Sequence, residues 1–321
     1  MSEAPQLPAA RWHAAEVAVW VAACACYFLF PGYRVLASQV FIAALFALSL
    51  DLVLGYAGIL TLGHAAFFGV GAYTAGLLAA HGWGEPLSGL AAAAAVAALA
   101  GFVVSFLVVR GEDLARLMVT LGIGLLVYEA ANRAAWLTGG ADGLQGVAMA
   151  KLLGLFAFDL EGRTAFVYSL AVLFAIFVAA RRLAASPFGL SLRAIRENRA
   201  RMPAIGAPVR RRLVAAFTLG AAIAGVAGAL LAQTTQFVGL DSLAFGRSAD
   251  VLIMLVLGGA GRLYGALVGP AVFMLAQDYL SGVNPVYWQF WLGLLLVAFV
   301  FVARGGILGA LDRMRRRFAR R

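Results

Sequence analysis

The stretch SPFGLSLRAIRENRARMPAIGAPVRRRLVAAF, residues 186–217, is the longest polar segment in a chain that is otherwise nearly all apolar. Seven arginines fall within it, and Arg181 and Arg182 closely precede it. Positively charged loops are retained on the cytoplasmic side of a membrane during insertion. So dense a cationic segment between two apolar runs is therefore predicted to be cytoplasmic, and it orients the rest of the chain.

The local pattern of this segment predicts a turn, a short helix and a second turn. Residues 186–189 are expected to form an extended turn, because proline disfavours the helical conformation in the residue before it and glycine relaxes the backbone. An amphipathic helix then follows, with Leu192, Ile195 and Arg199 on one side at spacings of three and four. Pro203 and the Gly-Ala-Pro turn after it are predicted to stop or bend this helix. Taken alone, the pattern fits equally well a charged loop that only sets orientation.

The composition indicates a membrane protein. Of the 321 residues, 63% are hydrophobic and 12% charged, which is too little polar surface to cover a soluble globule. The net charge of +10 could suggest a nucleic-acid partner, but 24 of the 25 basic residues are arginines that lie mainly between and after apolar runs. They are typical of topology charges. Cys24 and Cys26 lie inside the first apolar run, where small apolar residues are expected rather than a disulfide or metal pair.

Ten apolar segments are candidate crossings, since about 20 apolar residues span the hydrocarbon core as a helix. They are residues 14–30, 35–54, 62–81, 87–109, 115–135, 163–183, 213–234, 247–260, 263–280 and 286–303, of which the eighth is short. Starting from the inside, this count places 20 basic residues on the inner side and five outside. We therefore expect an all-α polytopic protein with about ten transmembrane helices, some short or discontinuous, in a single domain over residues 1–321. Both termini and residues 184–212 are then cytoplasmic, and the loop 136–162 is external.

A glycine-rich stretch, GYAGILTLGHAAFFGVGAYTAG, occupies residues 55–76. In a membrane, small residues let helices approach closely, and irregular backbone is tolerated only where protein or a water-filled cavity surrounds it. The stretch is therefore either a site of plain helix packing or a discontinuous helix that lines a translocation path. His64, the only histidine well inside an apolar stretch, is either a packed hydrogen-bonding residue or a substrate or proton site. With a second glycine-rich stretch around residues 258–269, the candidate path residues are Gly55, Gly58, Thr61, Gly63, His64, Gly258 and Gly259.

Motifs for catalysis, metals and phosphate binding are absent from the sequence. It contains no HExxH motif, no GxSxG elbow and no GxxxxGK[ST] phosphate loop; its one lysine, Lys151, has no such context. We therefore expect no catalytic residues, no cofactor and no metal, and we expect that the chain is not an enzyme. If ATP drives transport, another polypeptide must hydrolyse it.

Three blocks of sequence carry a resemblance to a known family. They are the stretch 55–76 quoted above, SPFGLSLRAIRENRARMPAIGAPVRRRLVAAFTLGAAIAGVAGAL at 186–230, and SADVLIMLVLGGAGRLYGALVGPAVF at 248–273. The outer stretch TGGADGLQG, residues 138–146, adds to them. In this order the blocks resemble the permease subunits of branched-chain amino acid ABC transporters, particularly their LivM-like branch.

The resemblance implies the ABC importer permease fold in the inner membrane, with no nucleic-acid partner. It implies a homologous second permease, two cytoplasmic ABC ATPases and a periplasmic solute-binding protein as partners. The ATPase-coupling residues it implies are Ile195, Arg196, Glu197, Asn198 and Gly206, in the position of the family's coupling loop, with Leu192 and Ile195 expected as apolar anchors on the ATPase. Met202-Pro203 departs from the small or acidic helix formers of the family pattern, so the resemblance locates the coupling helix but not its length.

The function implied is import of branched-chain or related amino acids. A permease of the same fold for urea or short amides would share every block quoted. A channel or carrier that needs no ATPase is a third alternative, but such proteins usually carry intramembrane ionisable residues for coupling. Central Asp, Glu and Lys residues are scarce in this sequence, which argues against it.

Overall fold

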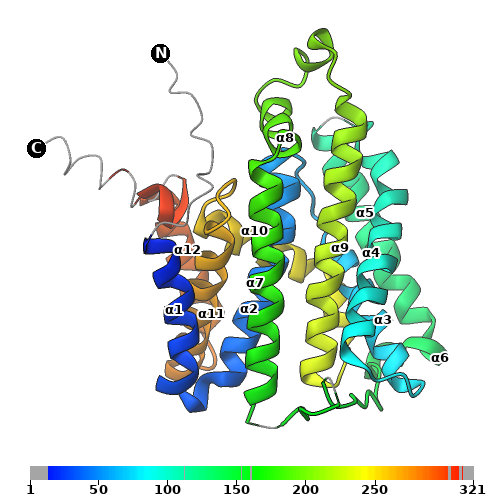
Figure 1. The fold of residues 1–321 in the computed structure, drawn as a ribbon, viewed down its shortest axis with the longest axis vertical. Coiled ribbons are helices and arrows are strands. Elements are labelled where there is room, and N and C mark those ends of the chain that lie inside the picture. Colours follow the sequence, from blue (N-terminus) through cyan, green and yellow to red (C-terminus); the bar gives the residue numbers. More distant parts are fainter. Residues whose placement is uncertain are drawn as a thin grey trace, which may run out of the picture.

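The computed structural model describes residues 14–111, 113–152, 154–159, 161–302, 305–310 and 313. This part of the chain is helical, with two isolated β-bridges, Leu144 with Val238 and Leu152 with Phe156 (Figure 1). Six of its helical segments are long and apolar enough to cross a bilayer: Pro31–Tyr56, Pro86–Val108, Leu114–Arg133, Arg163–Ala185, Val209–Thr235 and Gly265–Val283. The expected all-α polytopic architecture is confirmed.

Each of the ten predicted crossings contains a helix. In chain order these are α1 (Ala14–Leu29), α2 (Arg34–Leu50), α3 (Ala65–Ala80), α4 (Pro86–Val108), α5 (Asp113–Arg133), α7 (Arg163–Ala185), α9 (Val209–Thr235), α10 (Phe245–Gly258), α11 (Gly265–Val283) and α12 (Trp288–Val302). Between them lie the short helices α6 (Ala135–Thr138) and α8 (Pro187–Glu197) and the 3₁₀ turns Pro31–Tyr33, Gly140–Asp142, Met202–Ile205 and Leu240–Leu243.

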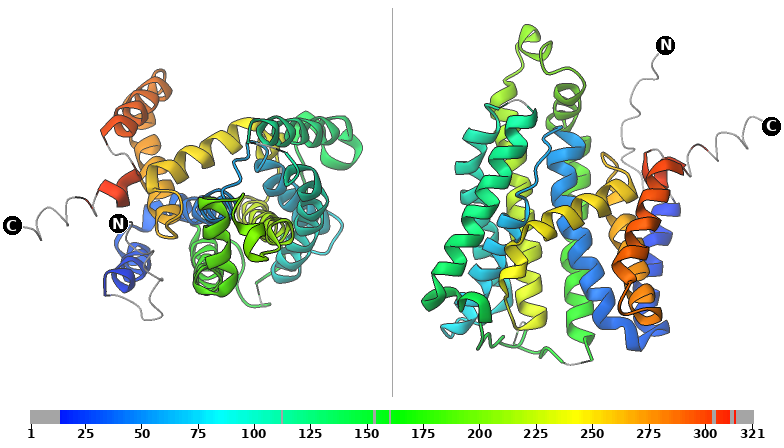
Figure 2. Two further views of the ribbon diagram at one scale, coloured as in Figure 1. Left: turned by 90° about the horizontal axis from the view of Figure 1, so that it is seen from above. Right: turned by 180° about the vertical axis from the view of Figure 1, so that it is seen from behind.

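The short eighth crossing is completed by a segment that is not regular α-helix. Val238 pairs with Leu144 of the 136–162 loop, at the end of the bundle opposite α8 (Figure 1). From there residues 236–244 run alongside α3, where Leu243 packs against Gly69, and α10 begins only at Phe245. Figure 2 shows α10, in yellow to gold, inclined to the long helices of the bundle. The 14 residues of α10 therefore do not have to span the membrane alone.

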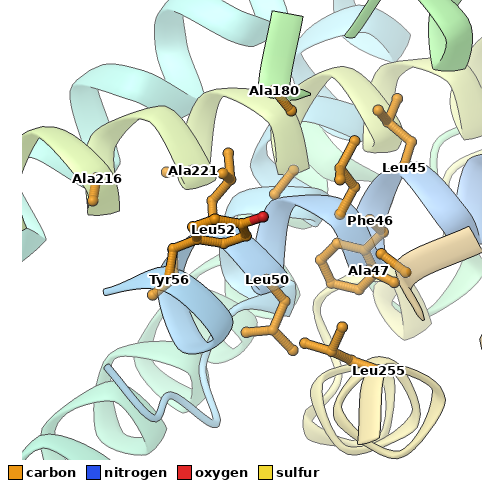
Figure 3. Close-up of a cluster of buried hydrophobic side chains, with 14 of the residues drawn as sticks. Leu45, Phe46, Ala47, Leu50, Leu52, Tyr56, Ala180, Ala216, Ala221 and Leu255 are labelled. Carbon is orange, nitrogen blue, oxygen red and sulfur yellow. The ribbon is translucent and has the colours of Figure 1, made fainter. Parts of the chain in front are cut away.

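The second crossing lies at the centre of the core. Leu45, Phe46, Ala47 and Leu50 of α2 belong to one buried cluster with Ala180 of α7, Ala216 and Ala221 of α9, and Leu255 of α10 (Figure 3). Because α2 is apolar around its circumference, it can be buried on several sides at once. The turn that follows α2, Asp51–Tyr56, therefore also lies inside the bundle.

Glycines bring α3, α4 and α9 into close contact. A Cβ atom at Gly228 of α9 would overlap the carbonyl oxygen of Phe68, and one at Gly225 would overlap the side chain of Ala97 of α4. Gly71 of α3 in turn faces Gly225. Small residues of this kind allow backbones to approach in a membrane, where apolar burial alone does not drive helices together. Gly225 and Gly228 thus give α9 a close-packing face.

The start of α1 and the residues after α12 lie at the same end of the bundle as α8. At the start of α1, Glu16 forms an ion pair of 2.9 Å with Arg181, near the end of α7 and just before α8. Gly306, after α12, packs against Gly259 at the end of α10. The predicted cytoplasmic ends themselves, residues 1–13 and 314–321, lie outside the described residues.

The polar segment differs from its prediction at both ends of the helix. The extended turn expected over 186–189 is wrong beyond Ser186, because α8 starts at Pro187 and the Ser186 Oγ caps it by accepting from the Gly189 N–H at 3.4 Å. Proline suits the first helical position, where its missing N–H has no partner to lose. The helix ends at Glu197, before Pro203, and a separate 3₁₀ turn, Met202–Ile205, follows.

Candidate translocation and coupling site

The second crossing ends in a break inside the bundle. After Leu50 the helix widens into a π-helical turn, Asp51–Tyr56, in which the Ala57 N–H donates to the Leu52 carbonyl at 3.2 Å. Residues 57–64 then follow without regular helix, and α3 starts at Ala65. We call residues 57–64 the break. A discontinuous helix is one of the two interpretations that the sequence leaves open for the glycine-rich stretch, and the structure shows it here.

Three hydroxyl groups satisfy N–H groups that the break leaves without helical partners. Thr120 of α5 accepts from the Leu62 N–H and Thr61 from the Gly63 N–H, each at 3.3 Å. Ser248 of α10 accepts from the Ala65 N–H at 2.9 Å. Backbone polar groups must be satisfied within the protein at membrane depth, so these contacts stabilise the break and tie it to α5 and α10.

His64 is held tightly in this conformation. It is buried, its Nε2 lies 2.8 Å from the Ser49 Oγ of α2, and its ring stacks on Phe46 with centroids 5.6 Å apart. Ser49 itself donates to the Phe46 carbonyl at 2.6 Å, so its hydroxyl accepts from the imidazole. His64 is thus a packed hydrogen-bonding residue here, the simpler of the two interpretations from the sequence.

A small pocket borders the break. Its lining includes Gly63 from the break, Gly124 and Leu125 from α5, and Phe245 and Ser248 from α10, and it has room for about one water molecule. A Cβ atom at Gly63 would overlap the Thr120 carbonyl oxygen, so the break and α5 are in backbone contact beside the pocket. The pocket is therefore too small to hold an amino acid in this conformation.

Two arginines of α8, and Arg199 just after the helix, donate hydrogen bonds to other elements. Arg193 donates to the Tyr56 hydroxyl at 3.2 Å, with its guanidinium 4.8 Å from the ring centroid. Arg196 donates to the Gly55 carbonyl oxygen in the π turn. Arg199 donates to the Val109 carbonyl at the end of α4 at 2.7 Å. Together they fasten α8 to the ends of α2 and α4.

The two predicted glycine-rich stretches meet at Arg196. The Asp51 Oδ1 accepts from the Gly261 N–H at 2.6 Å, which joins the α10–α11 turn to the π turn. Gly58 and Gly261 both have positive φ angles, 70° and 84°, and both lie against the Arg196 side chain. A Cβ atom would lie 2.9 Å from Cγ at Gly58 and 2.8 Å from Nη1 at Gly261. Glycine is required at these two positions by conformation as well as by space.

The remaining predicted path residues serve packing. A Cβ atom at Gly55 would overlap the Asp51 carboxylate, and one at Gly258 would overlap the Gly265 carbonyl of α11. Gly259 has a φ of 113° and lies beside the Gly305 carbonyl. Gly63 lines the pocket, whereas Gly258 and Gly259 lie at the opposite end of α10 from the pocket residues Phe245 and Ser248.

The predicted ATPase contacts divide into buried and exposed residues. Leu192 and Ile195 are buried within this chain's own core, Ile195 with 2% of its surface exposed, so in this conformation their side chains are not available as anchors for an ATPase. The amphipathic pattern indicates that one face of α8 is buried, and α7 and α9 pack against that face. Glu197 is exposed at the end of α8.

The loop after α8 is exposed and internally braced. The Asn198 Oδ1 accepts from the Arg201 N–H at 3.0 Å, and Gly206 takes a φ of 78° after the 3₁₀ turn. Ile205, next to Gly206, is 71% exposed. It is the large apolar side chain that this loop presents outward.

Sequence reasoning missed Asp51, Thr120 and Ser248. Asp51 had a usable signal, since it is a lone carboxylate inside the apolar run 35–54, and such residues are functional candidates. Thr120 and Ser248 had none, because hydroxyl residues are common in transmembrane helices and only the fold brings them to the break. Among the described residues, no three His, Cys, Asp or Glu side chains gather as a metal ion would require.

Comparison with known proteins then identifies the family. Residues 34–300 match the family model described as the branched-chain amino acid transport system / permease component. The chain belongs to this family.

Individual relatives agree with the family assignment. The permease is 32% identical over 302 residues to the high-affinity branched-chain amino acid transport system permease protein LivM of Escherichia coli, covering 85% of this chain and 69% of that protein. It is 31% identical, with the same coverage, to LivM of Salmonella typhimurium. A probable ABC transporter permease protein of E. coli, YphD, is 35% identical over 137 residues, 40% of each chain. No solved structure matches.

Family membership establishes the general role of the chain. It is a multi-pass membrane protein and the permease component of an ABC transport system, not an enzyme. Such a permease works with an ATPase and other transporter proteins.

Proposed function

We propose that this permease carries branched-chain or related amino acids across the inner membrane, as one of two homologous permease subunits in an importer. Two cytoplasmic ATPases and a periplasmic solute-binding protein complete the complex. The solute follows from the two LivM relatives, whose names specify branched-chain amino acids. The observation that carries the mechanism is the π turn and the break after α2, which Arg196 of α8 contacts at Gly55 and Gly58.

The proposed orientation places the α8 end of the bundle in the cytoplasm. Nine arginines lie between Arg181 and Arg212, at the end where α7 leaves and α9 enters the bundle. The start of α1 and residues 305–310 lie at that end too, and the loop 136–162 lies at the other (Figure 2). Both termini are then cytoplasmic and the loop 136–162 is external.

The proposed ATPase contact is the exposed middle part of the coupling segment 184–212, from Glu197 to Gly206. This stretch projects beyond the bundle in Figure 1 and carries Ile205 as an apolar side chain among charged residues. Apolar anchors contribute more to an interface than exposed ion pairs, about 1.5 to 3 kcal/mol against about 0 to 1 kcal/mol. Ile205 therefore takes the role that the sequence suggested for Ile195.

The proposed solute path passes along the pocket beside Gly63, and this chain forms one wall of it. At the edge of the pocket Leu125 and Phe245 are 53% and 46% exposed, so the pocket lies at the outer face of α5 and α10. The homologous permease would cover this face and supply the opposite wall.

A co-purification followed by reconstitution tests the proposal. The tagged permease is expressed with its companion subunits, the proteins retained in detergent are identified, and the complex is placed in proteoliposomes with ATP inside and binding protein outside. We expect retention of ATPase and second permease, and ATP-dependent uptake of labelled leucine but not of labelled urea. Uptake of urea alone would overturn the proposed solute class, and uptake without ATP would overturn the ABC mechanism for this complex.

A further inference from the structure

Asp51 is a buried carboxylate for which helix packing alone gives no reason. It is fully buried in the helical segment Pro31–Tyr56, in a stretch that is otherwise apolar. A carboxylate in such a place is costly unless hydrogen bonds and an opposite charge compensate it. Its neighbours therefore indicate what it does.

One oxygen of Asp51 is used and the other is not. Oδ1 accepts from the Gly261 N–H at 2.6 Å and holds the α10–α11 turn against the π turn. Oδ2 is buried and has no hydrogen-bond partner among the described residues. The Arg196 and Arg193 guanidinium groups act electrostatically on this carboxyl, but both donate elsewhere, to the Gly55 carbonyl and the Tyr56 hydroxyl. A strong acceptor is thus left free beside two strong donors.

The α10–α11 turn can pass a displacement to the pocket. Gly258 packs on the Gly265 backbone, and Gly269 packs on the Met254 carbonyl, so α10 and α11 form a tight hairpin. The other end of α10 carries Ser248, which bonds to Ala65 and lines the pocket. Interfaces packed this closely move as units rather than deforming.

We propose that Asp51 is the positioning residue through which α8 controls the α10–α11 hairpin. It holds Gly261 through Oδ1, and when α8 moves it takes the Arg196 guanidinium through Oδ2, so that Arg196 exchanges the Gly55 carbonyl for the carboxylate. Arg196 then has two discrete arrangements, one bonded to the Gly55 carbonyl and one bonded to the Asp51 carboxylate. Coupling between distant sites requires such a two-state element. The proposal rests on the proposed function, in that α8 is the part the ATPase displaces.

The experiment is a double-mutant cycle on the reconstituted complex, read as leucine transported per ATP hydrolysed. Asp51→Asn keeps an oxygen for the Gly261 N–H and removes the charge, Arg196→Gln removes the guanidinium, and the third variant carries both changes. Each single variant should transport at least about fivefold less per ATP, in the range typical of allosteric coupling, while the ATPase stays bound. The double variant should be no worse than the poorer single one, because the two residues act on each other.

The controls keep structural damage and failure of the proposed function apart. Asp278→Asn changes an exposed carboxylate on α11, about 20 Å along the helix from its start at Gly265, and should behave as wild type. If the wild-type complex transports no leucine, the proposed function fails, whatever the variants do. Wild-type coupling in Asp51→Asn, or losses in the double variant that multiply those of the single ones, would overturn the role of Asp51.

A second readout follows the hairpin directly. With Cys24 and Cys26 replaced by serine, a cysteine at Ala260 is alkylated in the nucleotide-free and ATP-bound complex. The labelling rate should depend on nucleotide with Asp51 present and lose that dependence in Asp51→Asn. The same nucleotide dependence in both would show that the turn moves without Asp51.

Discussion

The Ser49 hydroxyl lies 2.8 Å from the His64 Nε2 and joins α2 to the end of the break across 15 residues of sequence. Because Ser49 donates its own hydrogen to the Phe46 carbonyl, the imidazole donates to Ser49. The contact closes the loop formed by the π turn and the break. His64 is therefore a brace at the start of α3.

Removing this brace should lower stability. Ser49→Ala leaves the buried His64 N–H without an acceptor, which costs about 1 to 3 kcal/mol. The measurement is the thermal midpoint of the purified permease in detergent. Ser105→Ala is the matched control, since the Ser105 hydroxyl is also buried but bonds only to the Phe102 carbonyl of its own helix. An equal shift in both variants would argue against the brace.

A methyl group at Gly63 should impair transport. In Gly63→Ala the new Cβ atom would overlap the Thr120 carbonyl and force the break away from α5, at a cost of about 1 to 3 kcal/mol. Leucine uptake in proteoliposomes should fall at least about tenfold while the protein still inserts. Gly293→Ala in α12, where no atom lies within 4 Å of the new Cβ, should leave uptake unchanged. Normal uptake by Gly63→Ala would show that the contact between Gly63 and Thr120 is not part of the solute path.

Replacing Ile205 or Ile195 with aspartate should impair two different properties of the permease. Ile205→Asp changes an exposed side chain, so the permease should keep its thermal midpoint but retain about tenfold less ATPase, as expected for loss of one apolar anchor. Ile195→Asp buries a charge in the core and should reduce folded protein instead. The measurements are thermal unfolding and ATPase retention on the tagged permease. Full ATPase retention by Ile205→Asp would show that the ATPase docks on another surface of the permease.

Cysteine labelling should confirm the proposed orientation. In a variant without Cys24 and Cys26, a cysteine at the exposed Asp142 should react with a membrane-impermeant maleimide in intact cells. A cysteine at the exposed Ala204 should react only after the cytoplasmic side is opened. The reverse labelling pattern would show that the permease has the opposite orientation in the membrane.

Several parts of the fold could be predicted because one periodicity or one composition determines them. The ten helices follow from apolar length, and the break follows from the glycines of residues 55–76. The helical start at Pro187 was mispredicted, because Pro187 was interpreted through its effect on Ser186 and not as a favourable first helical residue.

The candidate site was less predictable, because it depends on which partner covers each surface. The pattern around Leu192 and Ile195 shows that α8 has an apolar face, but the same pattern arises whether the cover is a partner or the chain itself. The contact of Asp51 with Gly261 joins residues 210 positions apart. Only the packed bundle brings them together.

The π turn at Asp51–Tyr56 limits how the chain can change in length. A π turn holds about one residue more than an α turn, so deleting one residue there would restore a regular helix. Because the wide turn accommodates the extra residue, the deletion would leave the following chain nearly in register but would change the turn that presents the Gly55 carbonyl to Arg196. Homologous permeases that keep the contact between Arg196 and the Gly55 carbonyl should therefore keep the six-residue length of Asp51–Tyr56.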